Sequence, residues 1–359
     1  MIRNYSPVTE SDGERFVQVR KAEQLLISAT SELSARRLLC ASLGRAQFAA
    51  EFARRCPSAQ IDCFFLDLCQ SDLARHATSE FADRLNIHCE AELPAGEFDL
   101  VGFPFTAQGD GELTRELLQT GHERLTMQGK LIAATDNPED VWLHREMKKL
   151  FAKVTRLATK KGIIYRATKT SALKKVKKFE ATFAFRDHER LIYVVSRPSV
   201  FSHRHLDLGA RALIEAAEVR EGDRVLELGC GAGAVSFAVA MRAAGVQVTA
   251  LDANPRAVSC TKYGAQLNGL ANIGVQLNAD ANAGEKESFD LVLANPPYYS
   301  RFRIGHIFLR GAQRALRPGG ILQLVTKRPH EYAEHMPDAF RDVSVQAVRS
   351  YFVIRAVRK

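Results

Sequence analysis

Short apolar segments alternate with longer amphipathic ones over the first part of the chain. The apolar segments end at small or polar residues, which predicts buried strands. They are Leu38–Ser42, Ile61–Leu66, Phe98–Val101 and Gly129–Ala134. Helical patterns over Gln47–Arg55 and from about Glu112 to Leu125 lie between them. Strands that alternate with helices of this length predict a parallel sheet covered on both faces.

The same order of elements recurs in the second part of the chain. Its predicted strands are Val225–Leu228, Gln247–Leu251, Gly274–Leu277 and Phe289–Leu293. The tetrapeptide Phe98–Val101 returns as Phe289–Val292, 191 positions later. At the same offset, Gly129–Leu131 is matched by Gly320–Leu322. Equal offsets indicate an internal duplication. We therefore predict an α/β protein with two tandem doubly wound, Rossmann-like domains, each with a mostly parallel sheet that ends in an antiparallel hairpin.

A β-hairpin is predicted between the two repeats. Apolar and polar positions alternate in Glu180–Phe185 and in Leu191–Ser196, and we expect this hairpin to close the first sheet. Arg197-Pro198 follows it, and proline interrupts the interior of a sheet. We therefore place the domain boundary there, with residues 1–197 in the first domain and 198–359 in the second.

Composition limits the class of protein. Of the 359 residues, 46% are hydrophobic and 25% are charged, as in ordinary globular proteins. No window holds the roughly 18 apolar residues of a membrane span, and Met1–Glu10 lacks the apolar core of a secretory signal. The seven cysteines form no Cys-x-x-Cys pair, which is typical of reduced thiols and gives neither a disulfide framework nor a zinc site. We expect a cytoplasmic, monomeric protein without a membrane partner or a metal.

The net charge of +9 is concentrated in one region. Between Arg145 and Lys178 there are thirteen Lys and Arg residues against one acid, so this region carries +12 and the rest −3. Such a field attracts polyanions, although a solvated face without a partner would have the same composition. We expect RNA to contact the four lysines at its end, Lys174, Lys175, Lys177 and Lys178.

The segment Val225–Ala234, VLELGCGAGA, is the main candidate for a ligand site. Its alternating Gly229, Gly231 and Gly233 allow positive φ and a close approach of a ligand to the backbone. Free N–H groups in such a turn suit an electron-rich ligand. The spacing also satisfies the dinucleotide fingerprint. Glu227 favours a different cofactor, because its carboxylate would repel a pyrophosphate but could accept a hydrogen bond from an ammonium group.

Two further carboxylates follow predicted strands. Asp252 lies 19 residues after Gly233, where it could bind both ribose hydroxyls of a nucleoside cofactor. Alternatively it could cap the helix that begins near Pro255, as Asn254 could equally do. Asp280 could receive an adenine amino group or be an ordinary loop acid.

The sequence Asn295-Pro296-Pro297-Tyr298 is the most informative motif. The lone pair of an amine on a nucleobase is delocalised into the ring, so the amine is a poor nucleophile. The Asn295 side-chain oxygen and the Pro296 carbonyl could accept its two hydrogens and free that lone pair. The paired prolines would keep the loop rigid, and Tyr298, aided by Tyr299, could stack on the base. A proline-rich turn with a packed tyrosine is the structural alternative.

Together these segments resemble the bacterial small-subunit ribosomal RNA guanine-N2 methyltransferase family. The matching segments are Val200-Phe201-Ser202, Leu206-Asp207-x-Gly209, Leu226–Gly233, Asn295–Tyr298 and Tyr351–Val357. The resemblance implies class I domains, S-adenosylmethionine as cofactor, and ribosomal RNA or the small ribosomal subunit as substrate. It also implies that Phe201 and Ser202 help to enclose the cofactor. The family usually has Asn-Pro-Pro-Phe-His where this chain has Tyr298-Tyr299, which leaves the target nucleotide open.

The family also implies a degenerate first domain. Here Cys40–Arg45 replaces the glycine-rich turn and keeps one glycine, and Gly102–Phe105 contains no asparagine. The bulk of Leu43 and Arg45 would crowd a cofactor. We expect the first domain to be catalytically inactive and to serve in packing or RNA binding.

Other functions remain open from sequence. Methylation of a glutamine amide in a protein factor uses the same kind of motif, and amino methylation of another nucleic-acid base is a further enzyme alternative. A non-catalytic RNA-binding assembly factor is disfavoured by the intact motifs. A nicotinamide oxidoreductase is disfavoured by Glu227.

Overall fold

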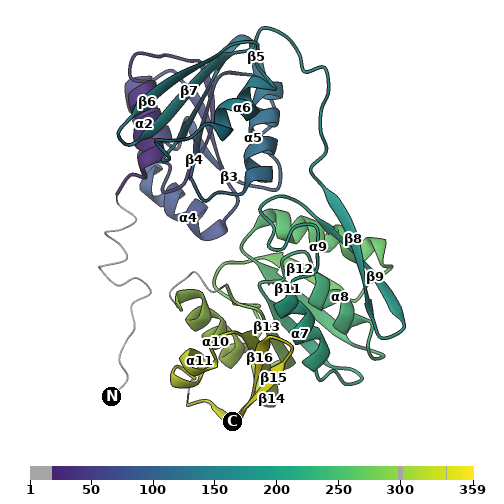
Figure 1. Ribbon diagram of the computed structural model, residues 1–359. Coiled ribbons are helices and arrows are strands. Elements are labelled where there is room, and N and C mark those ends of the chain that lie inside the picture. Colours follow the sequence, from purple (N-terminus) through teal and green to yellow (C-terminus); the bar gives the residue numbers. More distant parts are fainter. Residues whose placement is uncertain (1–17, 298–301, 337) are drawn as a thin grey trace, which may run out of the picture. The chain divides into compact units, whose positions relative to one another are not determined.

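The computed structural model describes residues 18–297, 302–336 and 338–359. These residues divide into two compact units, with the boundary between Phe179 and Glu180 (Figure 1). No helix in the described part of the chain is long and apolar enough to cross a membrane.

The first unit is built on a seven-stranded sheet in the order β3-β2-β1-β4-β5-β7-β6. The strands are β1 (Arg37–Ala41), β2 (Gln60–Phe65), β3 (Leu85–Cys89), β4 (Phe98–Phe105), β5 (Leu125–Thr135), β6 (Val154–Thr159) and β7 (Gly162–Thr168). The helices are α2 (Lys21–Ala29), α3 (Gln47–Arg55), α4 (Leu68–Ala77), α5 (Gly111–Arg124) and α6 (Trp142–Lys148), with the 3-10 helix η1 at Ser79–Phe81. Neighbouring strands from β3 to β5 are parallel, and β7 is antiparallel to both β5 and β6.

Helices cover both faces of this sheet, because its central strands are apolar on both sides. On one face, α2 and α3 contribute Leu26, Phe48 and Phe52, whose side chains are buried. On the other face, α5 and α6 contribute Leu118 and Met147. Figure 1 shows α2 and α5 on opposite sides of the strands. The predicted parallel sheet with two covered faces is therefore confirmed.

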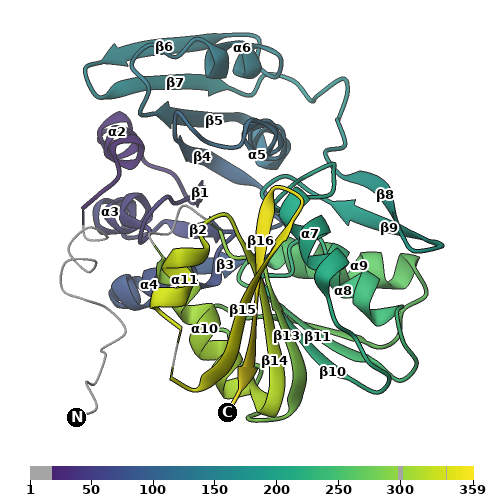
Figure 2. The same ribbon diagram turned by 60° about the horizontal axis from the view of Figure 1, so that its bottom comes forward.

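The second unit has a seven-stranded sheet in the order β12-β11-β10-β13-β14-β16-β15. Its strands are β10 (Arg224–Leu228), β11 (Gln247–Asp252), β12 (Ile273–Leu277), β13 (Phe289–Ala294), β14 (Leu316–Thr326), β15 (Phe340–Val348) and β16 (Tyr351–Arg358). Its helices are α7 (Leu208–Ala216), α8 (Ala234–Ala240), α9 (Pro255–Leu267), α10 (Arg303–Ala315) and α11 (Pro329–Glu334). Figure 2 shows α7, α8 and α9 on one side of this sheet, and α10 and α11 on the other. Leu213 and Phe237 are buried on the first side, and Leu309 and Tyr332 on the second.

The two units repeat one topology. Position by position their sheets have the same strand order and the same directions, with an antiparallel hairpin at the same end. Arg37 at the start of β1 corresponds to Arg224 of β10, 187 positions later. Phe98 of β4 corresponds to Phe289 of β13, 191 positions later. This agreement confirms the predicted fold class, and small length differences in the loops account for the change in offset.

The hairpin between the repeats was predicted in the wrong place. β8 (Ala181–Asp187) and β9 (Arg190–Ser196) pair with each other as a separate two-stranded sheet. The first sheet is closed instead by β6 and β7. In the second unit, β9 packs along α9, where the Tyr193 N–H donates to Asn268 Oδ1 at 2.9 Å and Asn268 Nδ2 donates to the Tyr193 carbonyl at 2.7 Å. The structural boundary therefore precedes the hairpin, at 179/180, and not at 197/198.

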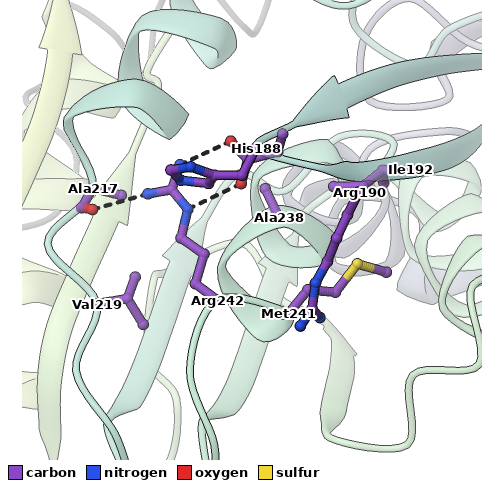
Figure 3. Close-up of a pocket in the computed structure, with 9 residues that line it drawn as sticks. His188, Arg190, Ile192, Ala217, Val219, Ala238, Met241 and Arg242 are labelled. Carbon is purple, nitrogen blue, oxygen red and sulfur yellow. Dashed lines mark hydrogen bonds and ion pairs between the residues drawn. The ribbon is translucent and has the colours of Figure 1, made fainter.

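A partly buried ion pair also holds the hairpin to the second unit. Arg242 donates from Nε and Nη2 to the two carboxylate oxygens of Asp187, each at 3.0 Å, and from Nη1 to the carbonyl of Ala217 at 2.9 Å (Figure 3). Such a two-pronged contact is both strong and directional. A hollow of about 400 Å³ lies beside it, lined in part by Arg190 and Met241. Its lining also includes Ala217 and Val219, which precede β10, so the hollow lies near the edge of the sheet at which β10 begins.

Candidate functional site

The predicted site residues of the second unit lie along one edge of its sheet. β10, β11, β12 and β13 are parallel, and the register pairs Leu228 with both Leu251 and Ala294, and Asp252 with Leu277. The glycine turn, Asp252, the loop containing Asp280, and Asn295 therefore all follow the carboxyl ends of adjacent strands. Ligands of open α/β sheets bind at this edge. The hollow beside Arg242 is at the opposite edge and is not part of this site.

The turn after β10 requires its glycines. Gly229, Gly231 and Gly233 have φ of +74°, +55° and +85°, which side chains with a Cβ rarely adopt. The N–H groups of Gly229 and Cys230 donate to the carbonyl of Leu251, each at 2.9 Å, and fix the turn to β11. A methyl group built on Gly231 would meet no protein atom within 4 Å. The protein thus leaves open the space over the middle of the turn.

Glu227 lies in β10 just before this turn and is 4% exposed. Its Oε2 accepts a hydrogen bond from the Ser236 hydroxyl of α8. Burial, with a smaller contribution from the charge of Asp252, raises the pKa of Glu227 to about 8 despite the hydrogen bonds from Ser236. A buried carboxyl with such a pKa would be stabilised in its ionised form by a cation beside it.

Asp252 faces the glycine turn. Its Oδ2 accepts from the Gly231 N–H and its Oδ1 from the Asn254 N–H, both at 2.8 Å. The helix α9 is capped instead by Asn254, whose Oδ1 accepts from the Arg256 N–H at 2.8 Å, with Pro255 at the first helical position. Capping of this helix by Asp252 is therefore excluded, and the contact of Asp252 with a ribose stays a prediction.

Asp280 follows β12 and is exposed. Its Oδ1 accepts from the Asn282 N–H at 3.1 Å, within a loop that also holds Ala281 at φ +55°. The adenine contact that the sequence suggests for Asp280 stays a prediction.

Asn295 follows β13 directly and is partly buried, and Pro296 after it is buried. The Nδ2 of Asn295 donates to Oδ2 of Asp207 at 2.8 Å. Tyr298 and Tyr299, which the sequence assigns to base stacking, lie outside the described residues. Sequence reasoning noticed Asp207 within a family motif but gave it no role, because its contact is with a residue 88 positions away.

The segment before α7 is attached to the turn that follows Asp252. Asn254 Nδ2 donates to the carbonyl of Ser199 at 3.0 Å, and the buried Arg256 donates to the carbonyl of Pro198 at 3.0 Å. Phe201 in this segment is 63% exposed, and Ser202 Oγ donates to the carbonyl of His205 at 3.1 Å. These anchors bring the segment near the carboxyl edge, where enclosing a cofactor stays a prediction for both residues.

In the first unit, the corresponding turn is occupied by the chain itself. Glu23 of α2 is fully buried, and its Oε1 accepts from Ser42 Oγ and from the Leu43 N–H, both at 2.6 Å. Its Oε2 accepts from the Phe48 N–H at 3.3 Å. Burial raises the pKa of Glu23 despite these hydrogen bonds. An internal carboxylate therefore uses the donors that a ligand would need.

One backbone feature of the counterpart is kept in this turn, although two of the three glycines are absent. Ala46 precedes α3 with φ +60°, as Gly233 precedes α8 with φ +85°. Holding alanine in this region costs roughly 1 kcal/mol or more, and the surrounding contacts must offset that cost. Sequence reasoning found the loss of glycines but missed Glu23, because a glutamate 19 residues before Ser42 carries no local signal.

The basic cluster Lys174, Lys175, Lys177 and Lys178 lies in the segment that precedes β8, and all four residues are exposed. The backbone of Lys177 is held on α5, where its N–H donates to Gln119 Oε1 and its carbonyl accepts from Gln119 Nε2, both at 2.9 Å. The lysine side chains are therefore on an ordered backbone and accessible to a partner. RNA contact stays a prediction.

Residues 191–356 match the family model of the methyltransferase small domain. The matched part is 166 of the 359 residues, a little under half of the chain. The match begins in β9 and ends in β16, so it spans most of the second unit and none of the first.

Curated relatives are similar to about half of this chain. A ribosomal RNA small subunit methyltransferase C of Alcanivorax borkumensis is 34% identical over 171 residues, which cover 45% of this chain and 51% of that protein. A ribosomal RNA large subunit methyltransferase G of Pseudomonas putida is 33% identical over 210 residues, 52% of this chain and 55% of that protein. The uncharacterised YbxB of Bacillus subtilis is 28% identical over 187 residues, 50% of this chain and 93% of that protein. The chain spans about half the length of the named methyltransferases.

Among solved structures, the T. thermophilus 16S rRNA N2 G1207 methyltransferase in complex with AdoMet and guanosine matches with a TM-score of 0.81. The match covers 95% of this chain and 92% of that one at 21% sequence identity, so it shows a shared fold. The predicted resemblance to the small-subunit methyltransferases is confirmed by these findings.

Proposed function

We propose that this protein transfers the methyl group of S-adenosylmethionine to an exocyclic amine of a ribosomal RNA base, with guanine N2 of small-subunit rRNA as the target. One observation carries the proposal. Asn295 and two prolines follow β13 directly beside the glycine turn, and the amide nitrogen of Asn295 is engaged by Asp207 so that its oxygen is the end left to meet a substrate.

The site residues fit the cofactor. The open space over Gly231 admits a ligand to the turn, and we assign Asp252, which is bonded to that turn, to the ribose hydroxyls. We assign the carboxylate of Glu227 to accept a hydrogen bond from the ammonium group of the cofactor. Phe201 and Ser202 belong to the segment anchored near Asn254, and Asp280 is assigned to the adenine amine. When bound, S-adenosylmethionine supplies an electrophilic methyl group on a sulfonium.

The chain's own contribution is orientation and lone-pair activation. Asn295 Oδ1 and the Pro296 carbonyl accept the two hydrogens of the amine, so its lone pair is drawn out of the ring system and toward the methyl group. Pro296 and Pro297 hold the backbone fixed, so little entropy is lost when the base is ordered. Tyr298 is assigned to stacking on that base.

RNA is favoured over a protein substrate by charge. A glutamine amide in a protein factor is also a planar nitrogen, and Asn295 could polarise it in the same way. The exposed lysine cluster of the first unit suits a polyanion. We assign residues 1–179 to scaffold and RNA binding without cofactor, since Glu23 occupies their turn, and residues 180–359 to catalysis. Labelled methyl transfer to rRNA and to a protein with exposed glutamine residues, compared side by side, distinguishes the two substrates.

The first prediction concerns pH. The pKa of about 8 for Glu227 means that this carboxyl is mostly neutral at pH 6 and ionises as the pH rises. Because the ionised form attracts the ammonium group, we expect affinity for S-adenosylmethionine to increase between pH 6 and 7.5, by up to about tenfold per pH unit. Glu227→Gln should bind more weakly, without this increase. Calorimetric titration of both proteins across that range is the measurement, and equal slopes would remove Glu227 from the cofactor site.

The second prediction concerns the lysine cluster. Replacing its four lysines by glutamine should weaken RNA binding across sequences and lower the steepness of log affinity against log salt by up to about 3.6, because each lost phosphate contact removes about 0.7 to 0.9. Affinity for S-adenosylmethionine should not change. The matched control carries four exposed lysines changed elsewhere, Lys21, Lys130, Lys262 and Lys286. If both variants lose the same amount of slope, the effect is net charge and not this cluster.

A further inference from the structure

The two ends of the Asn295 amide have opposite effects on an amine substrate. The oxygen accepts a hydrogen and raises the nucleophilicity of the amine, whereas the NH₂ group offers only donors. A flip about the last side-chain bond exchanges these ends at little steric cost. The orientation of the amide must therefore be determined by what contacts it.

Asp207 determines it. Oδ2 of Asp207 receives the hydrogen bond from Asn295 Nδ2 at 2.8 Å. An ionised carboxylate only accepts hydrogen bonds, so the flipped amide would bring two oxygens together and lose the bond. The amide NH₂ is thus held toward Asp207, and Oδ1 is directed elsewhere.

Asp207 is itself held firmly. It is the N-cap of α7, where the same Oδ2 accepts from the Ala210 N–H at 2.8 Å. The far end of α7 is bound to β14, because Gln323 accepts from the Glu218 N–H at 3.0 Å and donates to the Ala216 carbonyl at 2.8 Å. Because one end of α7 is capped by Asp207 and the other end is hydrogen-bonded to β14, the position of the Asp207 carboxylate is fixed relative to the sheet.

On the side of Gly209 there is little free space beside this pair. A methyl group added to Gly209 would lie 2.9 Å from Asp207 Oδ2, 3.1 Å from the ring of Tyr351 and 3.2 Å from Asn295 Oδ1. All three contacts are closer than an ordinary van der Waals separation. Tyr351 is 7% exposed and is the first residue of β16, which lies between β14 and β15 in the sheet. Asn295 and Asp207 are thus confined by backbone and by a buried ring.

The first unit provides an internal comparison. Its sheet register places Pro104 of β4 where the second unit has Asn295, since Phe103 pairs with Ala133 as Ala294 pairs with Leu324. Arg20 precedes α2 as Asp207 precedes α7, and it makes no side-chain cap. Both members of the pair are therefore missing from the copy to which we assign no catalysis.

We propose that Asp207 is a positioning residue for methyl transfer, which acts through Asn295 by fixing the direction of its amide oxygen. This inference rests on the proposed function. Asp207 does not contact the reacting atoms in this scheme, and helix capping is a second task of the same oxygen. A test has to separate these two tasks.

Two substitutions at position 207 separate them. Asp207→Ser keeps a good N-cap, but its shorter side chain does not reach Asn295. Asp207→Asn retains an oxygen at the position of Oδ2 and can keep both hydrogen bonds. We expect Asp207→Ser to lower the single-turnover rate by about 10- to 100-fold. Losses of this size are typical when the hydrogen-bond partner that orients a metal ligand is removed, and Asp207 orients Asn295 in the same way. Asp207→Asn should recover most of that loss, and dissociation constants for S-adenosylmethionine and RNA should stay unchanged in both.

The Asn295→Ala background decides whether Asp207 acts through Asn295. If it does, adding Asp207→Ser to Asn295→Ala should cause no further loss of rate. A full additional 10- to 100-fold loss in the double variant would show that Asp207 acts independently and would overturn the inference. A wild-type rate for the Asp207→Ser single variant would also overturn the inference. If the Asn295→Ala single variant were slow in the same assay, the proposed function would still hold. A wild-type rate for Asn295→Ala would instead contradict the proposed function itself.

Discussion

Replacing Asn295 by alanine is expected to leave the protein folded and able to bind RNA and S-adenosylmethionine, yet to slow methyl transfer by about 10²- to 10³-fold. Loss of one positioned hydrogen-bond partner in a site shielded from water is typically worth roughly 3 to 4 kcal/mol of barrier. Asn295 lies at the end of β13 and not in the core, so its truncation should cost little stability. The measurement is single-turnover transfer of labelled methyl to small-subunit particles at saturating cofactor.

Asn295→Asp provides a matched control for the oxygen. It keeps an acceptor, but the amide nitrogen that now donates to Asp207 at 2.8 Å becomes a second carboxylate oxygen. Two carboxylates at this distance cannot both be ionised without a large penalty. We expect this variant to be slow as well, with a rate that recovers in part when Asp207→Asn is added. Near-wild-type transfer by Asn295→Ala would contradict the mechanism, whatever the behaviour of the aspartate variant.

The second large effect is expected at the glycine turn. Gly231→Val should abolish detectable binding of S-adenosylmethionine, because its side chain would fill the open space over the turn and would have to adopt φ near +55°. Gly44→Val in the first unit should bind the cofactor normally. The atoms nearest to a methyl group there belong to the end of the Gln47 side chain, the closest at 2.6 Å, and that side chain can move.

Backbone strain has to be separated from loss of the ligand space. Gly222 has φ +76° and, like Gly231, no protein atom within 4 Å of an added methyl group, but it precedes β10 at the other edge of the sheet. Gly222→Val therefore carries comparable strain without touching the site, and it should retain cofactor binding in equilibrium dialysis. Equal loss of binding in Gly44→Val and Gly231→Val would contradict a single cofactor site in the second unit.

The sequence was sufficient where the signal is local. Three alternating glycines, a carboxylate at the end of the next strand and Asn-Pro-Pro after a third strand are each read within a few residues of a strand end. The register then brings these ends together, because carboxyl ends of parallel strands share an edge. The capping of α9 by Asn254 was also predictable, because the signal lies in two adjacent residues, Asn254 and Pro255.

The sequence was insufficient to predict contacts between residues that are far apart along the chain. Alternation in Glu180–Phe185 predicts a hairpin, but the partners that hold that hairpin, Arg242 and Asn268, are far along the chain. The hairpin that closes the first sheet was missed because β6 is exposed along its length and rich in polar residues. The contact of Asp207 with Asn295 likewise depends on tertiary packing and has no signature in the spacing of the residues.

Identifying the methylated product tests the central claim most directly. Undermethylated small-subunit rRNA and the corresponding particles are incubated with the protein and labelled S-adenosylmethionine, digested to nucleosides and separated by mass spectrometry. We predict that the label appears as N2-methylguanosine at one position, that Asn295→Ala reduces it by about 10²- to 10³-fold, and that the proteins of the particle remain unlabelled. Label in another nucleoside or in the protein fraction, with N2-methylguanosine absent, would contradict the account.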